Sequence, residues 1–122
     1  MVKSLNSKVD LVIKGTYHNW IVEYGDIMIG NAGFEFYNSR NVRKCVQINW
    51  DNIECVTAIV LFKGKWIPRF CIYTKDKITY NFSVKKPKKV LKIISHYISS
   101  DNMYRSLGFF KSIKQKFTSK NQ

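Results

Sequence analysis

The sequence predicts an α+β fold, a pleckstrin-homology-like (PH-like) roll of about seven antiparallel strands capped by a C-terminal helix and followed by a second amphipathic helix. Two observations predict this fold. Apolar and polar residues alternate in short stretches through residues 8–84, and the apolar period changes to helical spacing after Lys85. At 122 residues the chain has the length of one small domain, so we expect residues 1–122 to form a single PH-like unit.

The first expected strands are short, alternating segments separated by turn residues. A turn at residues 30–33, rich in glycine and asparagine, joins two of them into a hairpin, because these residue types tolerate the positive φ of tight turns. A polar loop follows at residues 38–41. These strands are expected at residues 9–14, 27–29, 34–36 and 46–50.

The later strands carry a stronger apolar signal. Residues 53–62 are almost continuously apolar, which is typical of a buried strand. Residues 70–74 and 78–84 alternate, and turns are expected before them at 63–65 and 75–77.

Two helices are expected after the strands. The first covers residues 87–98, with Pro87 at its start, where the missing N–H of proline costs nothing. The second covers residues 102–117, with Asp101 as its cap. One helix would close the open end of the bent sheet. A plain β-sandwich is the competing fold, although it leaves the second helix with less to pack against.

Charge is distributed unevenly along the chain. Residues 61–122 hold fifteen Lys/Arg and two acids, which accounts for the whole formal charge of +13, and residues 1–60 are neutral. This asymmetry indicates an acidic partner, namely nucleic acid, anionic lipid or an acidic protein face. The alternative is that the charge serves solubility and reflects genome-wide composition.

Several patterns bear on the compartment. The longest apolar run, residues 58–62, is far shorter than the ~20 residues that span a bilayer. The N-terminal residues lack the apolar segment of a secretory signal. Three cysteines without C-x-x-C spacing are typical of thiols in a reducing cytoplasm. We therefore expect a cytoplasmic protein, free or peripheral at the inner face of the membrane.

No pattern for catalysis is visible. His18 and His96 have no Cys, Asp or Glu at metal-ligand spacing, and the eight acids are scattered singly. Nucleophile and nucleotide-binding motifs are absent from the sequence. We expect a protein that is not an enzyme, with no metal, cofactor or catalytic residue.

A basic and aromatic hairpin is the first candidate binding element. Lys63, Lys65, Trp66 and Arg69 surround a turn that can dock on phosphates or insert at a membrane interface. The alternative is that Trp66 and Ile67 fold back on the core and the cations are only solvated.

A lysine cluster at the first expected helix is the second candidate. Lys85, Lys86, Lys88 and Lys89 flank Pro87 at the positive end of the helix dipole, where like charge destabilises by a few tenths of a kcal/mol each. A helix N-terminus with lysines is suited to an anion. The alternative is a harmless, poorly optimised surface.

The second expected helix is a weaker candidate for contact with a membrane or a partner. A basic amphipathic helix can lie on an anionic surface, although its first two turns can equally pack on the domain. Specific DNA binding is less favoured, because no helix-turn-helix pattern is visible and only four residues are arginine. The residues in this helix are Phe109, Lys111, Lys114, Lys116 and Phe117.

Six stretches of the chain resemble the ManO family of Gram-positive bacteria, small proteins filed as a domain of unknown function. The resemblance covers residues 4–114, and FKGKWIPR (62–69) and KKPKKVL (85–91) are its most specific parts. The lysine-rich end after Lys114 is outside the pattern. The other stretches are SLNSKVDLV (4–12), GDIMIGNAGFEFYN (25–38), VQINWDNI (46–53) and MYRSLGFFKSIK (103–114).

The resemblance implies a role in sugar uptake. Family members are typically encoded beside genes of the mannose-class sugar phosphotransferase system and are labelled regulators of the mannose operon. The expected function is therefore a non-enzymatic regulator or accessory protein of this uptake system, which acts through the basic and aromatic residues on a phosphotransferase component or on the inner membrane surface. The alternatives are a transcription regulator that binds mannose-operon DNA directly and an unrelated lipid-binding module.

Overall fold

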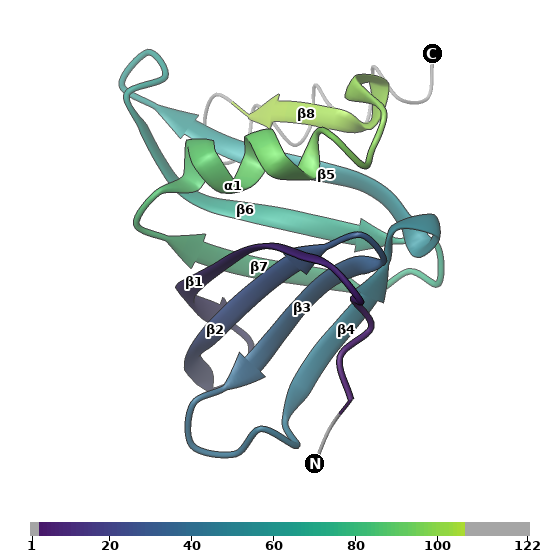
Figure 1. Ribbon diagram of the computed structural model, residues 1–122. Helices are drawn as coiled ribbons and strands as arrows, with labels where there is room; N and C mark the ends of the chain where they lie inside the picture. The colour runs from purple at the N-terminus through teal and green to yellow at the C-terminus, as the bar shows by residue number, and fades with distance from the viewer. Residues whose placement is uncertain (1–2, 107–122) are drawn as a thin grey trace.

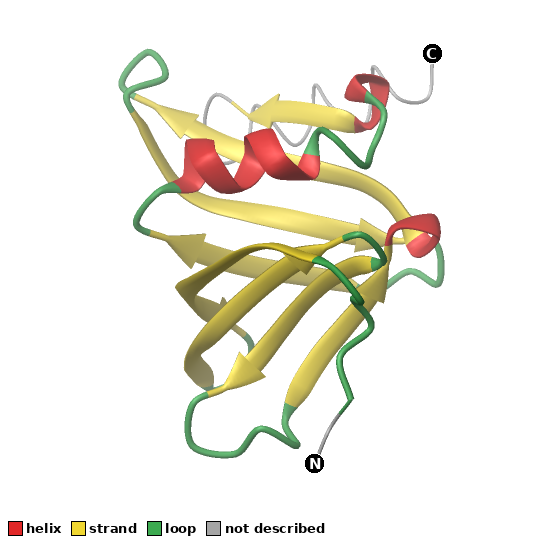
Figure 2. Ribbon diagram, viewed as in Figure 1, coloured by secondary structure: helices red, strands yellow, loops and turns green. Residues whose placement is uncertain are grey.

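Eight strands form one continuous mixed sheet in the computed structural model, which describes residues 3–106 (Figure 1). Their spatial order is β4-β3-β2-β1-β7-β6-β5-β8. One α-helix, α1 (Pro87–Ile94), is present among these residues (Figure 2). The strands are β1 (Val9–His18), β2 (Val22–Gly30), β3 (Gly33–Asn38), β4 (Cys45–Asn49), β5 (Ile53–Leu61), β6 (Trp66–Thr74), β7 (Thr79–Val84) and β8 (Met103–Ser106).

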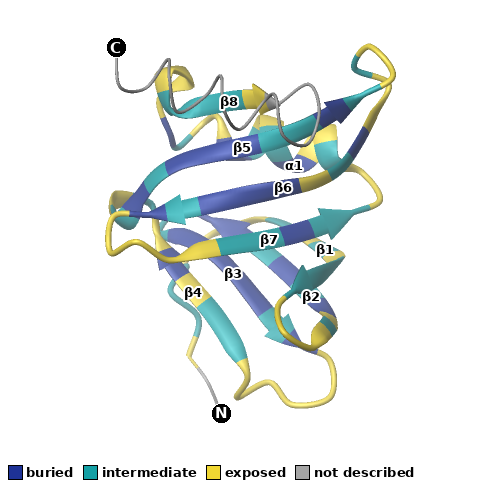
Figure 3. Cartoon of the chain, turned by 180° about the vertical axis from the view of Figure 1, so that it is seen from behind, coloured by how far each residue is buried: buried dark blue, intermediate teal, exposed yellow. Residues whose placement is uncertain are grey.

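The sheet bends between β1 and β7 into two four-stranded halves, and α1 lies across the half formed by β5–β8 (Figure 1). Three residue pairs join the halves: Gly15 with Val84, Thr16 with Ser83 and Tyr17 with Phe82. The core fills the space between the bent halves and α1, as the buried stretches of β3, β5 and β6 show (Figure 3). Its centre is aromatic, because Phe34, Phe36, Phe70 and Phe82 are all fully buried.

Helix α1 is short and is held by its apolar side. Pro87 occupies the first turn, where it needs no hydrogen-bond acceptor. Val90 and Ile94, four residues apart, are fully buried on the side that packs against β6 and β1. The helix ends at Ile94, earlier than the expected boundary at residue 98.

The predicted fold class is wrong. The structure is mostly β, with eight strands in a mixed sheet and a single α-helix in the described range, and it is not a roll of seven antiparallel strands with two helices. The expected hairpin turns at residues 30–33, 63–65 and 75–77 are confirmed by the antiparallel pairs that they join.

The first residues of the second expected helix form a strand instead. Residues 103–106 form β8, which pairs parallel with β5 through contacts such as Val56 with Met103. Asp101 caps no α-helix, because its N–H is bound to Ser99 Oγ in a short 3-10 turn. The edge of β5 supplies backbone partners that outweigh the helical spacing of the apolar residues. The rest of the expected helix lies outside the described residues.

A fully buried carboxylate fastens the N-terminal segment to the sheet. Glu35 in β3 has an exposed fraction of 0% although it lies on the face opposite the core. Burial acts to raise its pKa, but the hydrogen bonds to the carboxylate outweigh burial, so the pKa of Glu35 lies below its usual value. The donors are Ser4 Oγ (2.5 Å), Leu5 N (3.0 Å), Asn6 Nδ2 (2.8 Å), Gln47 Nε2 (2.9 Å) and Tyr37 Oη.

Asn6 extends this network to the β2–β3 turn. Its side-chain oxygen accepts hydrogen bonds from Ala32 N at 2.6 Å and from Gly33 N at 2.9 Å. The close approach requires glycine at residue 30, where a Cβ would lie 2.8 Å from Asn6 Cβ and 2.3 Å from the Lys8 oxygen. The N-terminal segment is therefore part of the folded domain.

Replacing Glu35 by Gln is expected to lower the free energy of unfolding by about 2 kcal/mol or more, since several donors lose a charged acceptor. Because the pKa of Glu35 is lowered in the folded protein, wild-type stability falls as pH drops below the usual glutamate range, and the variant should lose this part of the pH dependence. Urea denaturation at several pH values measures both effects.

Asp51→Asn, at an exposed acid, is the control and should change stability by less than about 0.5 kcal/mol. A Glu35→Gln variant as stable as this control would contradict the network's role.

Candidate functional site

The turn between β5 and β6 is strained and projects from the sheet (Figure 1). Phe62 and Lys63 have φ angles of 53° and 56°, and Gly64 follows with φ of 89°. A left-handed backbone costs roughly 1–2 kcal/mol for each residue other than glycine. The turn is closed by two backbone hydrogen bonds of 3.2 Å, from Gly64 N to the Leu61 carbonyl and from Lys65 N to the Phe62 carbonyl.

An exposed aromatic pair sits on this turn. The rings of Phe62 and Trp66 stack with centroids 5.9 Å apart and an interplanar angle of 17°. Phe62 is 69% exposed and Trp66 is 52% exposed, whereas Ile67 is buried. The sequence left open whether Trp66 and Ile67 are exposed or fold back on the core. In the structure the indole of Trp66 is exposed, and Ile67 folds back on the core.

The lysines that precede and begin α1 lie at the same end of the molecule as this turn, as two opposite views show (Figures 1 and 3). The first turn of α1 contains no acid, and its cap residue Lys86 makes no side-chain capping bond. Asp76 lies at the opposite end of β6, where its carboxylate accepts a hydrogen bond from Thr74. We call the combined surface the basic end; it consists of the exposed residues Phe62, Lys63, Lys65, Trp66, Lys85, Lys86, Lys88 and Lys89.

Arg69 is exposed, three residues after Trp66, on the face of β6 opposite the core residue Phe70. It stands near His18, whose Nε2 is 2.8 Å from Ser83 Oγ. Burial first, and then the charge of Arg69, lower the pKa of His18.

The remaining predicted contact residues, Phe109, Lys111, Lys114, Lys116 and Phe117, lie outside the described residues. Within residues 3–106, no three His, Cys, Asp or Glu side chains come together as metal ligands. No helix in the same range is long and apolar enough to cross a membrane.

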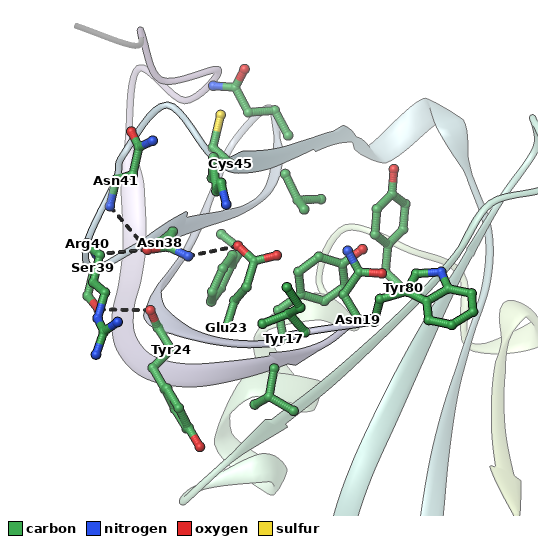
Figure 4. A pocket seen from close by; sticks show the side chains of 17 residues that line it. Tyr17, Asn19, Glu23, Tyr24, Asn38, Ser39, Arg40, Asn41, Cys45 and Tyr80 are labelled. Carbon is green, nitrogen blue, oxygen red and sulfur yellow. Dashed lines mark hydrogen bonds between the residues drawn. The ribbon is translucent and has the colours of Figure 1, made fainter.

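A pocket of about 1000 Å³, which the sequence did not indicate, opens on the core side of β1–β4 (Figure 4). Tyr17, Phe36 and Tyr80 form aromatic walls from three different strands. Glu23 reaches toward the middle of the pocket and accepts a 2.8 Å hydrogen bond from Asn38 Nδ2. Burial, the neighbouring Tyr80 and the carboxylate of Glu23, in that order, raise the pKa of Tyr17.

Exposed apolar side chains gather around this pocket. Trp20 is 100% exposed and Ile21 is 77% exposed, both in the turn between β1 and β2. Clustered apolar exposure of this kind marks interaction sites on soluble domains. The signal in the sequence was the placement of tryptophan and isoleucine in a turn, where polar residues are usual. Val22, Tyr24 and Val42 are also exposed at this end.

Together these features define a small, mostly β domain with two candidate binding surfaces, the basic end and the pocket. The chain belongs to the family described as domain of unknown function DUF956, which matches residues 1–117. This description carries neither the ManO name nor a link to mannose. No curated protein matches the chain.

The fold has a counterpart among solved structures. The crystal structure of the C-terminal domain of an unknown protein from Leishmania infantum is similar, with a TM-score of 0.65 and 10% sequence identity. The similarity covers 74% of this chain and 83% of that one. At this identity the likeness shows the fold alone.

Replacing Arg69 by Gln is expected to raise the pKa of His18, because one of the two causes that lower it is removed. The pKa should still remain below the usual histidine value, since burial is the larger cause. Arg69→Lys, which keeps the charge, serves as the matched control. Titration of the His18 ring signals by NMR measures the pKa in each variant, and an unchanged value in Arg69→Gln would contradict the proximity of the two side chains.

Proposed function

We propose that this protein is a non-enzymatic accessory or regulatory protein of mannose-class sugar phosphotransferase uptake, and that it docks through its basic end on the anionic inner face of the membrane. The observation that carries the docking is the stacked, exposed pair Phe62 and Trp66, which projects on a strained turn beside the lysines. The link to sugar uptake comes from the resemblance of residues 4–114 to the ManO family.

The chemistry of the basic end fits an anionic bilayer in two ways. Lysines near an anionic bilayer contribute about 1 kcal/mol each through electrostatic attraction. Aromatic rings favour the interfacial region, where an apolar body and a polar edge are both accommodated. A strained turn that holds Phe62 and Trp66 outward is consistent with a surface kept for contact, since strain of this kind clusters at functional sites.

Direct binding to operator DNA is the second candidate. A two-stranded ribbon can enter the major groove, and the β5–β6 hairpin carries Lys63 and Lys65 at its tip. Lysine contacts to phosphate are blind to sequence, however, and the exposed aromatic pair has no role in them. The bilayer is therefore the better-supported partner of this surface.

The double variant Lys86→Glu/Lys89→Glu should bind vesicles of phosphatidylcholine and phosphatidylglycerol at least about tenfold more weakly than the wild type, because two attractive charges become repulsive. Co-sedimentation measures the bound fraction, with pure phosphatidylcholine vesicles as the uncharged reference. Lys75→Glu/Lys77→Glu is the matched control, since it makes the same charge change at exposed positions at the other end of β6. Trp66→Ser should also weaken binding and leave its salt dependence in place.

Equal binding by the two double variants would contradict docking through the basic end. Retention of a mannose-operon promoter fragment well above random DNA at about 150 mM salt would favour the DNA-binding alternative. Co-purification of the chain with mannose permease subunits from membranes of the native host tests the assignment to sugar uptake separately. If the chain binds anionic vesicles but does not co-purify with the permease, the result would support membrane docking and contradict the assignment to sugar uptake.

A further inference from the structure

Strand β4 forms an edge of the sheet and directs alternate backbone groups outward. Two backbone bonds flank its pairing with β3: the Lys44 carbonyl accepts from Asn38 N at 3.1 Å, and the Trp50 N–H donates to the Ala32 carbonyl at 3.2 Å. The pairing between these bonds is unbroken. Because the direction of the backbone groups alternates along an antiparallel edge, the N–H and C=O groups that face outward belong to Cys45, Gln47 and Asn49.

This edge is open in the structure. Among residues 3–106, no hydrogen bond to another strand engages the N–H or C=O of Cys45 or Gln47, or the N–H of Asn49, whereas the C=O of Asn49 begins the 3-10 turn Trp50–Asn52. The N-terminal segment reaches Gln47 only through its side chain, whose Nε2 donates to the Lys3 carbonyl at 2.8 Å. The opposite end of the sheet differs, because β8 covers β5 there.

The composition of β4 does not protect it from pairing. Natural edge strands are usually blocked by charges, proline or a bulge, and the sequence CVQIN contains no charge and no proline. The register with β3 shows no bulge. A further strand added to β4 would find regular backbone partners about 4.8 Å away.

The pocket lies on the core side of the same strand. Val46 of β4 lines it together with Phe36, Tyr17 and Tyr80. In an added strand every second side chain would point to this side, because strand side chains alternate between faces. A volume of about 1000 Å³ is large enough for a bulky apolar side chain with its neighbours.

Charge around this edge selects the occupant. Arg40, Arg43 and Lys44 are all exposed in the loop before β4, and residues 36–50 contain no acid. The acidic residue that lines the pocket is Glu23, whose carboxylate accepts a hydrogen bond from Asn38 Nδ2. The exposed Trp20 and Ile21 form an apolar rim at the pocket. An occupant that combines acidic residues with a bulky apolar side chain would match both features.

We propose that β4 and the adjacent pocket bind an extended segment of a partner protein, which adds to the sheet as a further strand. Its backbone pairs with Cys45, Gln47 and the N–H of Asn49, its apolar side chain enters the pocket, and its acidic residues face Arg40, Arg43 and Lys44. Strand addition takes its affinity from the backbone and its specificity from such pockets. This site is separate from the basic end and does not depend on membrane docking.

Asn49 allows a sharp test, because its backbone already has the conformation of proline. Its φ is −67° and its ψ is 145°, and its side chain makes no capping bond. Asn49→Pro removes one outward N–H and places the proline ring in the path of an added strand, with no strain in the fold. Asn49→Ala is the matched control, since it removes the same side chain and keeps the N–H.

The probe is a set of labelled peptides of about nine residues, rich in valine and threonine, with one central phenylalanine and glutamates at either end. Fluorescence anisotropy with the full chain should show binding that Asn49→Pro weakens at least tenfold relative to Asn49→Ala. Trp20→Ser and Arg40→Glu/Arg43→Glu should each weaken binding severalfold. In NMR spectra, the amide signals of Cys45, Gln47 and Asn49 should shift more than those of Val46 and Ile48.

Three results would overturn the proposal. One is equal binding by Asn49→Pro and Asn49→Ala, when both have wild-type melting temperatures. Another is the absence of binding by every peptide at about millimolar concentration, where even contacts worth only ~4 kcal/mol are visible. The third is a concentration-dependent dimer that Asn49→Pro abolishes, because it would assign the edge to a second copy of this chain.

Discussion

The pairing of β1 with β7 determines where every other element lies. It joins two four-stranded halves through three residue pairs, and the ring of Tyr17 stacks on Phe82 at 5.1 Å where the halves meet. Gly15 leaves room for the buried side chain of Ile27 in β2, since a Cβ there would lie 2.4 Å from Ile27 Cδ1. The bend created at this junction closes the core against α1 on one side and leaves the pocket open beside Tyr17 and Tyr80 on the other.

The two candidate surfaces differ in the forces that they offer a partner. The basic end combines lysines with two exposed rings, and its attraction for an anionic surface is long-ranged and sensitive to salt. The edge of β4 offers backbone hydrogen bonds and an apolar pocket, which act only on contact and select shape. The two proposals together describe a domain that holds a partner segment while it rests on a membrane.

Much of the basic end could be predicted from the sequence, because its residues fall in two local runs, FKGKW and KKPKK. The pocket could not be predicted, since Tyr17, Glu23, Phe36 and Tyr80 come from four strands that only the bent sheet brings together. The burial of Glu35 could not be predicted from the sequence either. In an alternating strand it occupies an ordinary polar position, and its burial depends on Ser4, Leu5 and Asn6, some thirty residues earlier in the chain.

The sequence by itself determined the local features of this protein: the alternation of the strands, the turns between them, the proline at the start of α1 and the concentration of charge in the second half. These features depend on neighbouring residues, whose periodicity and backbone preferences are visible in the chain. Only the tertiary structure decided that residues 103–106 form a parallel strand on β5, that Glu35 is buried and that β4 is the terminal strand at one end of the sheet. Each of these outcomes depends on which distant backbone or side-chain groups become available as partners, and local propensity carries no information about them.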